Sequence, residues 1–448
     1  MIRTLATIVT ICVCSGWVHA GNYDGILLGN NAALSAGAVA ATTNEASALW
    51  YNPAGLAGER MHSVDASGSA FVLRIRPINA LIRTKLDTEI RDSDIENIEL
   101  LSVGSSLSNA WRLADDLSFA VGVYQPEAEQ FSFRSFERST IGGATAQEYR
   151  QEFAADTVTD RFHVGLGVGW QATETFRIGI ALFGIYRNVV STSSIGAGAH
   201  APEDPDDASG FVLSGSSLNL DHFGLQLSLG IQWAPTDDLS LALVVKSPAL
   251  LFAEMGTFNS SYGFANVEVP RQSQGAFEAE SVDLAATEAS MALPLYACLG
   301  VAYRYGSGLV SLEADIHSPF YDAALDETRQ LTWNLRFGFV HDIDAEWRIG
   351  AGLFTDHSAT SSIDRVGEFD IDYYGLTFGF RTSTRLGLKL KDRPELMMTT
   401  TFALRYAIGT GQVGAFDFDP LGTSESKVTP RDALLHEVTL HIGSTLSY

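Results

Sequence analysis

The sequence predicts an all-β protein, a transmembrane antiparallel β-barrel of about 14 strands. Near the end of the chain, Val438, Leu440, Ile442, Leu446 and Tyr448 alternate with polar or small residues. Such alternation gives a strand one apolar and one polar face, and the aromatic end fits the aromatic girdles of outer-membrane barrels. The chain also contains 41 Gly and 25 Phe with only 18% charged residues, a composition that favours strands and interfacial aromatics.

Composition also narrows the classes of protein. After Gly21 the chain has no run of about 18 apolar residues, so a helical membrane span is excluded and a closed barrel is the remaining way to cross a bilayer. The formal net charge is -24, from 53 acidic against 29 basic residues. This excess of negative charge argues against nucleic acid as a partner.

Residues 1–20 are predicted to be a secretory signal peptide. Arg3 supplies the positive start, Leu5–Val13 the apolar core, and Val18–Ala20 the small-residue cleavage site. We therefore expect the mature chain to begin at Gly21. Cys298 is the one cysteine beyond this segment, so no internal disulfide is expected, and we interpret Cys298 as a small buried hydrophobe.

The repeating unit of the chain is a hairpin with short turns and aromatic rims. It is clearest over 161–189 and again over 223–245, where Trp170 and Trp233 stand beside short turns. We expect strands near 60–76, 98–113, 116–134, 147–170, 174–192, 219–234, 238–248, 292–305, 308–318, 330–342, 346–357, 369–383, 396–411 and 433–448. An even number of strands returns both termini to the periplasmic side of an outer membrane.

The longest outer connections are expected at about 192–219 and 248–291, as extracellular loops. The first is rich in Gly, Ser and acidic residues, whereas the second is unusually apolar. Its apolar side chains form either a groove for an apolar ligand or a loop that packs on itself. The groove candidates are Leu250, Leu251, Phe252, Met255, Phe258 and Phe264.

The segment before the first strand is not a strand. It is rich in Ala and Gly from Gly37 to Ala57 and contains Asn52-Pro53-Ala54. Here the chain resembles the FadL-type outer-membrane hydrocarbon transporters, in which a small N-terminal hatch ends in an Asn-Pro-Ala element. The strand count, the two long connections and Leu293-Pro294 entering a strand extend the resemblance over the mature chain. It implies a hatch at 21–58 inside a barrel at 59–448.

The resemblance implies passive uptake of long-chain fatty acids or other hydrophobic small molecules across the outer membrane of a Gram-negative cell. The implied protein is a monomer with periplasmic termini, and its surroundings are the lipid bilayer, lipopolysaccharide and the barrel assembly machinery. In the family, a kink in the third strand opens a lateral exit. Pro126 is the candidate here, because proline cannot donate to a strand ladder; alternatively it marks the outer end of that strand.

Charged residues occur at positions expected to face the lumen. Arg336, Arg348, Arg381 and Arg405 are candidates to hold a carboxylate headgroup, because guanidinium binds carboxylate bidentately. The stronger interpretation is that such arginines pair with lumenal acids, for example Glu313 and Asp315.

Catalytic and metal motifs are missing from the sequence. There is no Gly-x-Ser-x-Gly elbow, and His436 and His441 lie on opposite faces of one strand. The acidic run 203–207 lacks the ligand spacing of a calcium loop. We therefore expect no enzyme activity, no metal and no cofactor. The alternative function is a structural scaffold barrel that anchors partner proteins; a barrel lipase is a weaker third.

Overall fold

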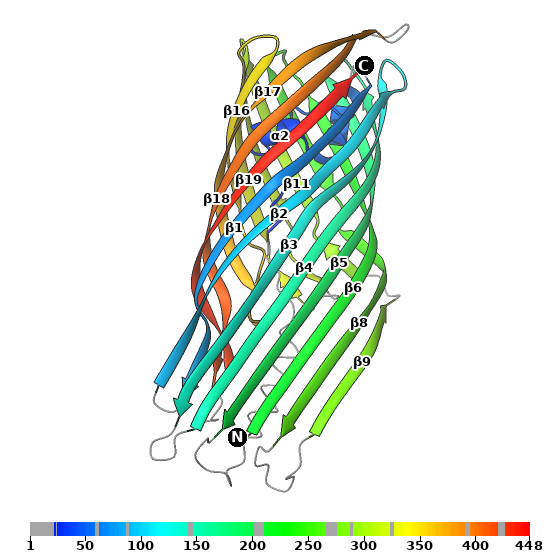
Figure 1. Ribbon diagram of the computed structural model, residues 1–448. Helices are drawn as coiled ribbons and strands as arrows, with labels where there is room; N and C mark the ends of the chain where they lie inside the picture. Colours follow the sequence, from blue (N-terminus) through cyan, green and yellow to red (C-terminus); the bar gives the residue numbers. More distant parts are fainter. Residues whose placement is uncertain are drawn as a thin grey trace.

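A computed structural model shows the fold (Figure 1). It describes residues 22–23, 25–58, 62–86, 89–141, 147–200, 210–265, 276–286, 290–322, 327–389, 395–419 and 426–448. The predicted signal peptide lies outside the described residues. In the described part of the chain, no helix is both long and apolar enough to cross a membrane.

The wall is a closed antiparallel barrel of 14 strands, as predicted. Its segments are β1 (Ser63–Leu86), β2 (Glu89–Arg112), β3 (Leu117–Ile141), β4 (Gln147–Gln171), β5 (Phe176–His200), β6 (Gly210–Trp233), β7 (Leu239–Lys246), β8 (Ala249–Ala265), β9 (Ala276–Ala286), β10 (Ser290–Leu293), β11 (Tyr296–Tyr305), β12 (Gly308–His317), β15 (Thr332–Asp342), β16 (Trp347–Asp356), β17 (Phe369–Lys389), β18 (Glu395–Phe418) and β19 (Lys427–Ser447). A separate pair is formed by β13 (Phe320–Asp322) and β14 (Glu327–Arg329).

Interrupted strands explain why there are more segments than barrel strands. Both β7 and β8 pair with β6, so they are consecutive parts of one barrel strand. Likewise β9, β10 and β11 pair with β8 or β7 and together make the next strand. The barrel closes where β1 pairs with β19, from Ser63↔Ser447 to Ile75↔His436. Closure removes the free edges that a membrane-spanning sheet cannot leave unpaired.

The outer surface of the barrel is apolar, and small or polar residues alternate toward the lumen. Leu299 on β11, Leu353 on β16 and Phe378 on β17 are 64%, 58% and 59% exposed. Trp170 and Trp233 lie at the ends of their strands next to short turns. This distribution is the one that lipid on the outside of a barrel selects.

Both predicted long loops are largely strand, so that part of the prediction is wrong. β5 runs to His200 and β6 starts at Gly210, while β8 and β9 occupy most of 249–286. The middle of each connection, 201–209 and 266–275, lies outside the described residues. The physical reason is that ladder hydrogen bonds extend these strands although their Ser, Gly and acidic residues show little alternation.

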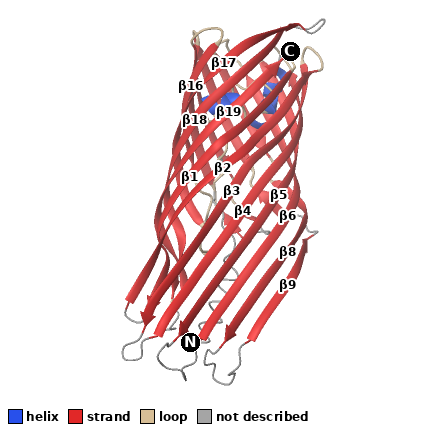
Figure 2. Ribbon diagram, viewed as in Figure 1, coloured by secondary structure: helices blue, strands red, loops and turns tan. Residues whose placement is uncertain are grey.

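The N-terminal segment lies inside the barrel, near the end where the chain terminates (Figure 2). It contains α2 (Asn30–Leu34), α3 (Ala48–Tyr51) and the 3-10 helix η1 (Pro53–Gly58). The helix α2 contacts β15 to β19, whereas η1 contacts β3 to β6. The segment therefore bridges two walls of the lumen. At the opposite end of the strands the interior holds an apolar cluster that includes Phe131, Phe153 and Phe416.

We expect Leu299→Arg to lower the free energy of unfolding from lipid vesicles by about 2–4 kcal/mol, because a cation on the lipid face near the bilayer midplane destabilises the folded barrel. Urea titration of the refolded protein measures this change. The matched control is Ile343→Arg, since Ile343 is 59% exposed but lies in a short turn, where the cost falls to about 0–1 kcal/mol. Equal losses in the two variants would contradict the placement of β11.

Candidate functional site

Asn52-Pro53-Ala54 is packed inside the barrel against β6 and neighbouring strands. Asn52 is fully buried. Its Nδ2 donates to the carbonyl of Ala40 at 2.9 Å and to that of Ile231 on β6 at 3.0 Å. Its Oδ1 accepts from the backbone N–H of Ala54 at 3.1 Å. The side chain therefore ties two turns of the N-terminal segment to each other and to the wall.

A row of three glycines in the wall makes room for this tripeptide. Gly169 on β4 pairs with Gly179 on β5, which pairs with Gly230 on β6. A Cβ atom on Gly179 would lie 2.2 Å from the carbonyl carbon of Pro53, and one on Gly230 would lie 2.0 Å from Oδ1 of Asn52. Any larger residue at these positions would force the segment away from the wall.

The opposite wall repeats the arrangement. Gly338 on β15 pairs with Gly352 on β16, and Cβ atoms on them would lie 2.6 Å and 2.7 Å from side-chain carbons of Ser35 and Ala36. Asn30 donates from Nδ2 to side-chain oxygens of Asp65 and Thr445, both at 2.9 Å. The segment is thus held by close packing and buried hydrogen bonds on both sides.

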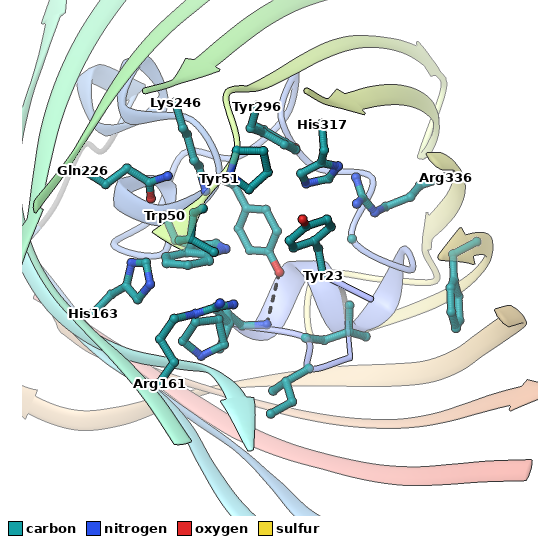
Figure 3. A pocket seen from close by; sticks show the side chains of 18 of the residues that line it. Tyr23, Trp50, Tyr51, Arg161, His163, Gln226, Lys246, Tyr296, His317 and Arg336 are labelled. Carbon is teal, nitrogen blue, oxygen red and sulfur yellow. Dashed lines mark hydrogen bonds between the residues drawn. The ribbon is translucent and has the colours of Figure 1, made fainter. Parts of the chain in front are cut away.

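A cavity with a volume of ≈ 100 Å³ lies beside the segment (Figure 3). Aromatic and aliphatic side chains from the N-terminal segment and from the wall form most of its lining. The lining residues are Tyr23, Ile26, Leu27, Leu28, Ala36, Gly37, Trp50, Tyr51, Pro126, Arg161, His163, Gln226, Lys246, Leu293, Pro294, Tyr296, His317, Arg336, Phe354 and Arg405.

Among the residues that the structure describes, the charged side chains lining this cavity are all basic. Lys246 at the end of β7 places its Nζ 4.0 Å from the ring centroid of Trp50 and 5.4 Å from that of Tyr296. The electron-rich faces of two rings thus hold the ammonium group at the cavity. Arg161 pairs with Glu127 at 2.7 Å. The lining therefore presents cations and aromatic faces to the cavity, whereas the carboxylate of Glu127 is not part of it.

Two of the four predicted arginines reach the cavity. Arg336 lies 2.6 Å from Asp315 and 3.9 Å from Glu313, so the predicted pairing with these acids is confirmed for Arg336. Arg405 pairs with Glu437 and stands over the ring of Phe354 at 4.2 Å. Both guanidinium groups are thus held by carboxylates at the edge of the cavity.

The other two predicted arginines serve different parts of the wall. Arg348 pairs with Asp342 next to a short turn, and its Nη2 lies 2.9 Å from Oδ2 of Asp342. Arg381 donates to Oδ1 of Asn31 in α2 at 2.8 Å. Neither belongs to the cavity lining, because their positions on β16 and β17 lie beyond it. Both arginines therefore hold structural partners here, and a headgroup role for Arg348 and Arg381 stays a prediction.

The six groove candidates do not form one surface. Leu250, Phe252 and Met255 are each 54% exposed, whereas Leu251 is 2% exposed. Phe258 packs against the buried pair Leu218 and Leu220 of β6. The segment is a strand, so its side chains divide between two faces, and the described candidates do not all line one groove. The side chain of Phe264 lies outside the described part of the structure.

Pro126 lies within β3 and not at its outer end, so that alternative is wrong. The ladder between β3 and β4 is interrupted between Tyr124 and Glu127 and then continues to Ile141. Pro126 also lines the cavity. The irregularity of the third strand is therefore located at the wall of the lumenal site.

Sequence reasoning missed most of the cavity. Trp50 adjoins the Asn-Pro-Ala element, yet its environment of Tyr124, His163 and Phe183 comes from β3, β4 and β5. Lys246 carried one usable signal, a lone lysine at the end of an apolar strand just before Pro248. In the described residues no group of three potential metal ligands occurs.

Comparison with known proteins defines the class of fold. No protein-family model and no curated protein matches the sequence. Solved structures do match over nearly the whole chain. A FadL homologue from Pseudomonas aeruginosa is 13% identical over 97% of this chain and 99% of its own, with a TM-score of 0.53. The P. putida toluene transporter TodX is 12% identical over 95% and 99%, with a TM-score of 0.56.

The Ralstonia pickettii toluene transporter TbuX is likewise 12% identical over 95% of this chain and 99% of its own, with a TM-score of 0.52. These similarities establish the fold. The chain has the fold of the FadL-type hydrocarbon transporters, as the resemblance in its sequence predicted.

We expect Gly179→Leu to displace the N-terminal segment, because its side chain would occupy the space of Pro53. Two measurements check this: limited proteolysis of residues 22–58 and conductance in a planar bilayer, both of which should rise. The control is Gly184→Leu on the same strand, where the nearest atom to an added Cβ is 3.8 Å away. A folded Gly179→Leu protein with wild-type proteolysis and conductance would contradict the docking role of the glycine row.

Proposed function

We propose that this protein is an outer-membrane channel for the passive uptake of hydrophobic small molecules. The observation that carries the proposal is the cavity between the N-terminal segment and the barrel wall, with its aromatic, aliphatic and basic lining. A scaffold barrel needs no such space, and a packed lumen would serve it better. The fold shared with a toluene transporter and a FadL homologue supports the same conclusion.

The size of the cavity bears on the substrate. Its volume of ≈ 100 Å³ is somewhat below the roughly 150 Å³ that holds a benzene molecule in a protein core. A monoaromatic hydrocarbon therefore needs a small adjustment of the lining, whereas a long-chain fatty acid needs a larger movement of the N-terminal segment. We propose small aromatic or short hydrophobic molecules as the first substrates to test, with long-chain fatty acids second.

Capture is proposed at the outer ends of the strands. The apolar cluster there borders a small cavity lined by Ile82, Phe133, Phe153, Ile195 and Phe416, among others. These side chains come from five strands and form an apolar region. This region takes the role in capture that the sequence suggested for the 248–291 segment. A ligand that enters here would pass toward the basic cavity next to Trp50.

Release is proposed to involve the segment 21–58 as a hatch, with Asn52-Pro53-Ala54 at its base. Support comes from the way the segment is docked: on two sides it packs against glycines and small side chains of the wall. A small rotation of the segment would loosen these contacts. The break in the β3 ladder at Pro126 is the proposed lateral exit. Both proposals follow the resemblance to the family.

Uptake of labelled toluene and labelled oleate by cells with and without the protein tests the function. We expect faster toluene uptake in the cells that carry it, because the cavity fits a single ring more closely than an acyl chain. Faster oleate uptake alone would replace the proposed substrate class. Unchanged rates for both compounds would reject hydrophobic uptake for these two classes and favour the scaffold.

A second prediction concerns the charge at the cavity. We expect Lys246→Met to slow uptake of a carboxylate such as oleate or benzoate by about tenfold, while toluene uptake stays near wild type. A hydrogen bond to a charged group is worth about 1.5–3 kcal/mol, and 1.4 kcal/mol is tenfold in affinity. Lys85→Met, near the outer end of β1, is the control. Equal effects on toluene and benzoate would contradict a headgroup role for Lys246.

A further inference from the structure

The barrel wall contains a seam between β2 and β3. These strands pair over a short stretch only, from Ser106↔Tyr124 to Arg112↔Ser118. Beyond it β2 stays paired with β1 as far as Glu89, and β3 stays paired with β4 as far as Ile141. Within the described residues, no ladder pair joins the two strands along this outer part. The facing strand edges therefore need other partners.

Side chains supply partners for the backbone of β3 along this seam. Arg74 on β1 donates from Nη1 to the carbonyl of Ala128 at 3.2 Å, and Arg76 donates from Nη1 to that of Gln130 at 3.3 Å. Asn97 on β2 donates from Nδ2 to the carbonyl of Ser132 at 2.8 Å.

The three carbonyls belong to alternate residues, 128, 130 and 132, so they lie on one edge of β3. Three side-chain donors thus stand where the backbone N–H groups of β2 would stand in a continuous ladder. The arginines reach this edge from β1, across β2, on the lumenal side of the wall.

Ion pairs hold both arginines in this position. Arg74 lies 3.0 Å from Glu129 on β3 and 2.9 Å from Glu437 on β19. Arg76 lies 3.1 Å from Glu129 and 3.7 Å from Glu99 on β2. The side chains of the two arginines are 3% and 5% exposed, so both guanidinium groups are shielded from water, and salt screens their pairs less than it screens surface pairs.

We propose that Arg74, Arg76 and Asn97 form a polar latch that holds the β2–β3 seam closed. A backbone ladder can part only by moving a strand against all of its hydrogen bonds, whereas side-chain donors can rotate away singly. The inference rests on the lateral exit proposed above: that exit adjoins the seam at Pro126, and the latch sets how often the wall opens there. Pro126, which lines the cavity, stands where the seam begins.

Spin labels across the seam test the latch without any transport measurement, so its failure and a failure of the proposed function are distinguishable. The labels are placed at Leu100 on β2 and Phe136 on β3, which are 65% and 61% exposed, on a Cys298→Ser background in lipid nanodiscs. We expect one narrow distance distribution in the otherwise unchanged protein. In the double variant Arg74→Gln with Arg76→Gln, the distribution should become broader and longer.

The control variant is Arg83→Gln, on the same strand. Arg83 pairs with Asp92 at 2.7 Å within the continuous β1–β2 ladder, so its loss should leave the distances unchanged. Asn97→Ala is measured in parallel, because it removes one donor to β3 and leaves both arginines and their ion pairs in place, so it should broaden the distribution less. Heat-dependent gel migration verifies folding. Unchanged distances in the folded double variant, or in Asn97→Ala if the double variant does not fold, would overturn the latch.

Discussion

The structure depends on one constraint, which is that backbone groups in lipid must find hydrogen-bond partners within the protein. Closure of β1 onto β19 meets that constraint for the wall as a whole. It also explains why interrupted strands such as β7 and β8 stay in one barrel position, since each part keeps a ladder with β6. Because the backbone is satisfied by the ladders, the side chains can differ between the two faces of the wall. They are apolar toward lipid and small or polar toward the lumen.

Small lumenal residues have a second consequence. A wall lined by large side chains would fill the barrel by itself, whereas paired glycines leave grooves into which another part of the chain can pack. The rows Gly169–Gly179–Gly230 and Gly338–Gly352 receive the N-terminal segment on opposite walls. Packing of the segment and the shape of the cavity are thus consequences of the same choice of residues.

The strands could be predicted because alternation is local information. Val438 to Tyr448 or Phe162 to Trp170 reveals its two faces without knowledge of any neighbour. The same test failed over 192–219 and 248–291, which are largely strand although their residues alternate weakly. There the ladder, which the sequence does not display, determines the structure.

The cavity could be predicted only in part for a related reason. Arg336 and its acids sit on adjacent strands in register, Glu313↔Arg336 and Asp315↔Asn334, so strand phase was enough to bring them together. Trp50 and Lys246 are almost two hundred positions apart in the sequence, and their contact depends on how the N-terminal segment docks. Sequence patterns identify which residues face the lumen, whereas the contents of the lumen are a matter of tertiary packing.

At the β2–β3 seam the hydrogen bonds of the backbone are supplied by side chains, whereas elsewhere in the wall a backbone ladder supplies them. A ladder satisfies donors and acceptors of both strands at once and needs no charged group. The side chains of Arg74, Arg76 and Asn97 satisfy one edge of β3, and the buried arginines then require Glu129, Glu437 and Glu99 as counter-charges. A wall whose only requirement was stability would use the ladder throughout, because buried ion pairs add little net stability. The polar arrangement is understandable where the wall has to come apart and close again.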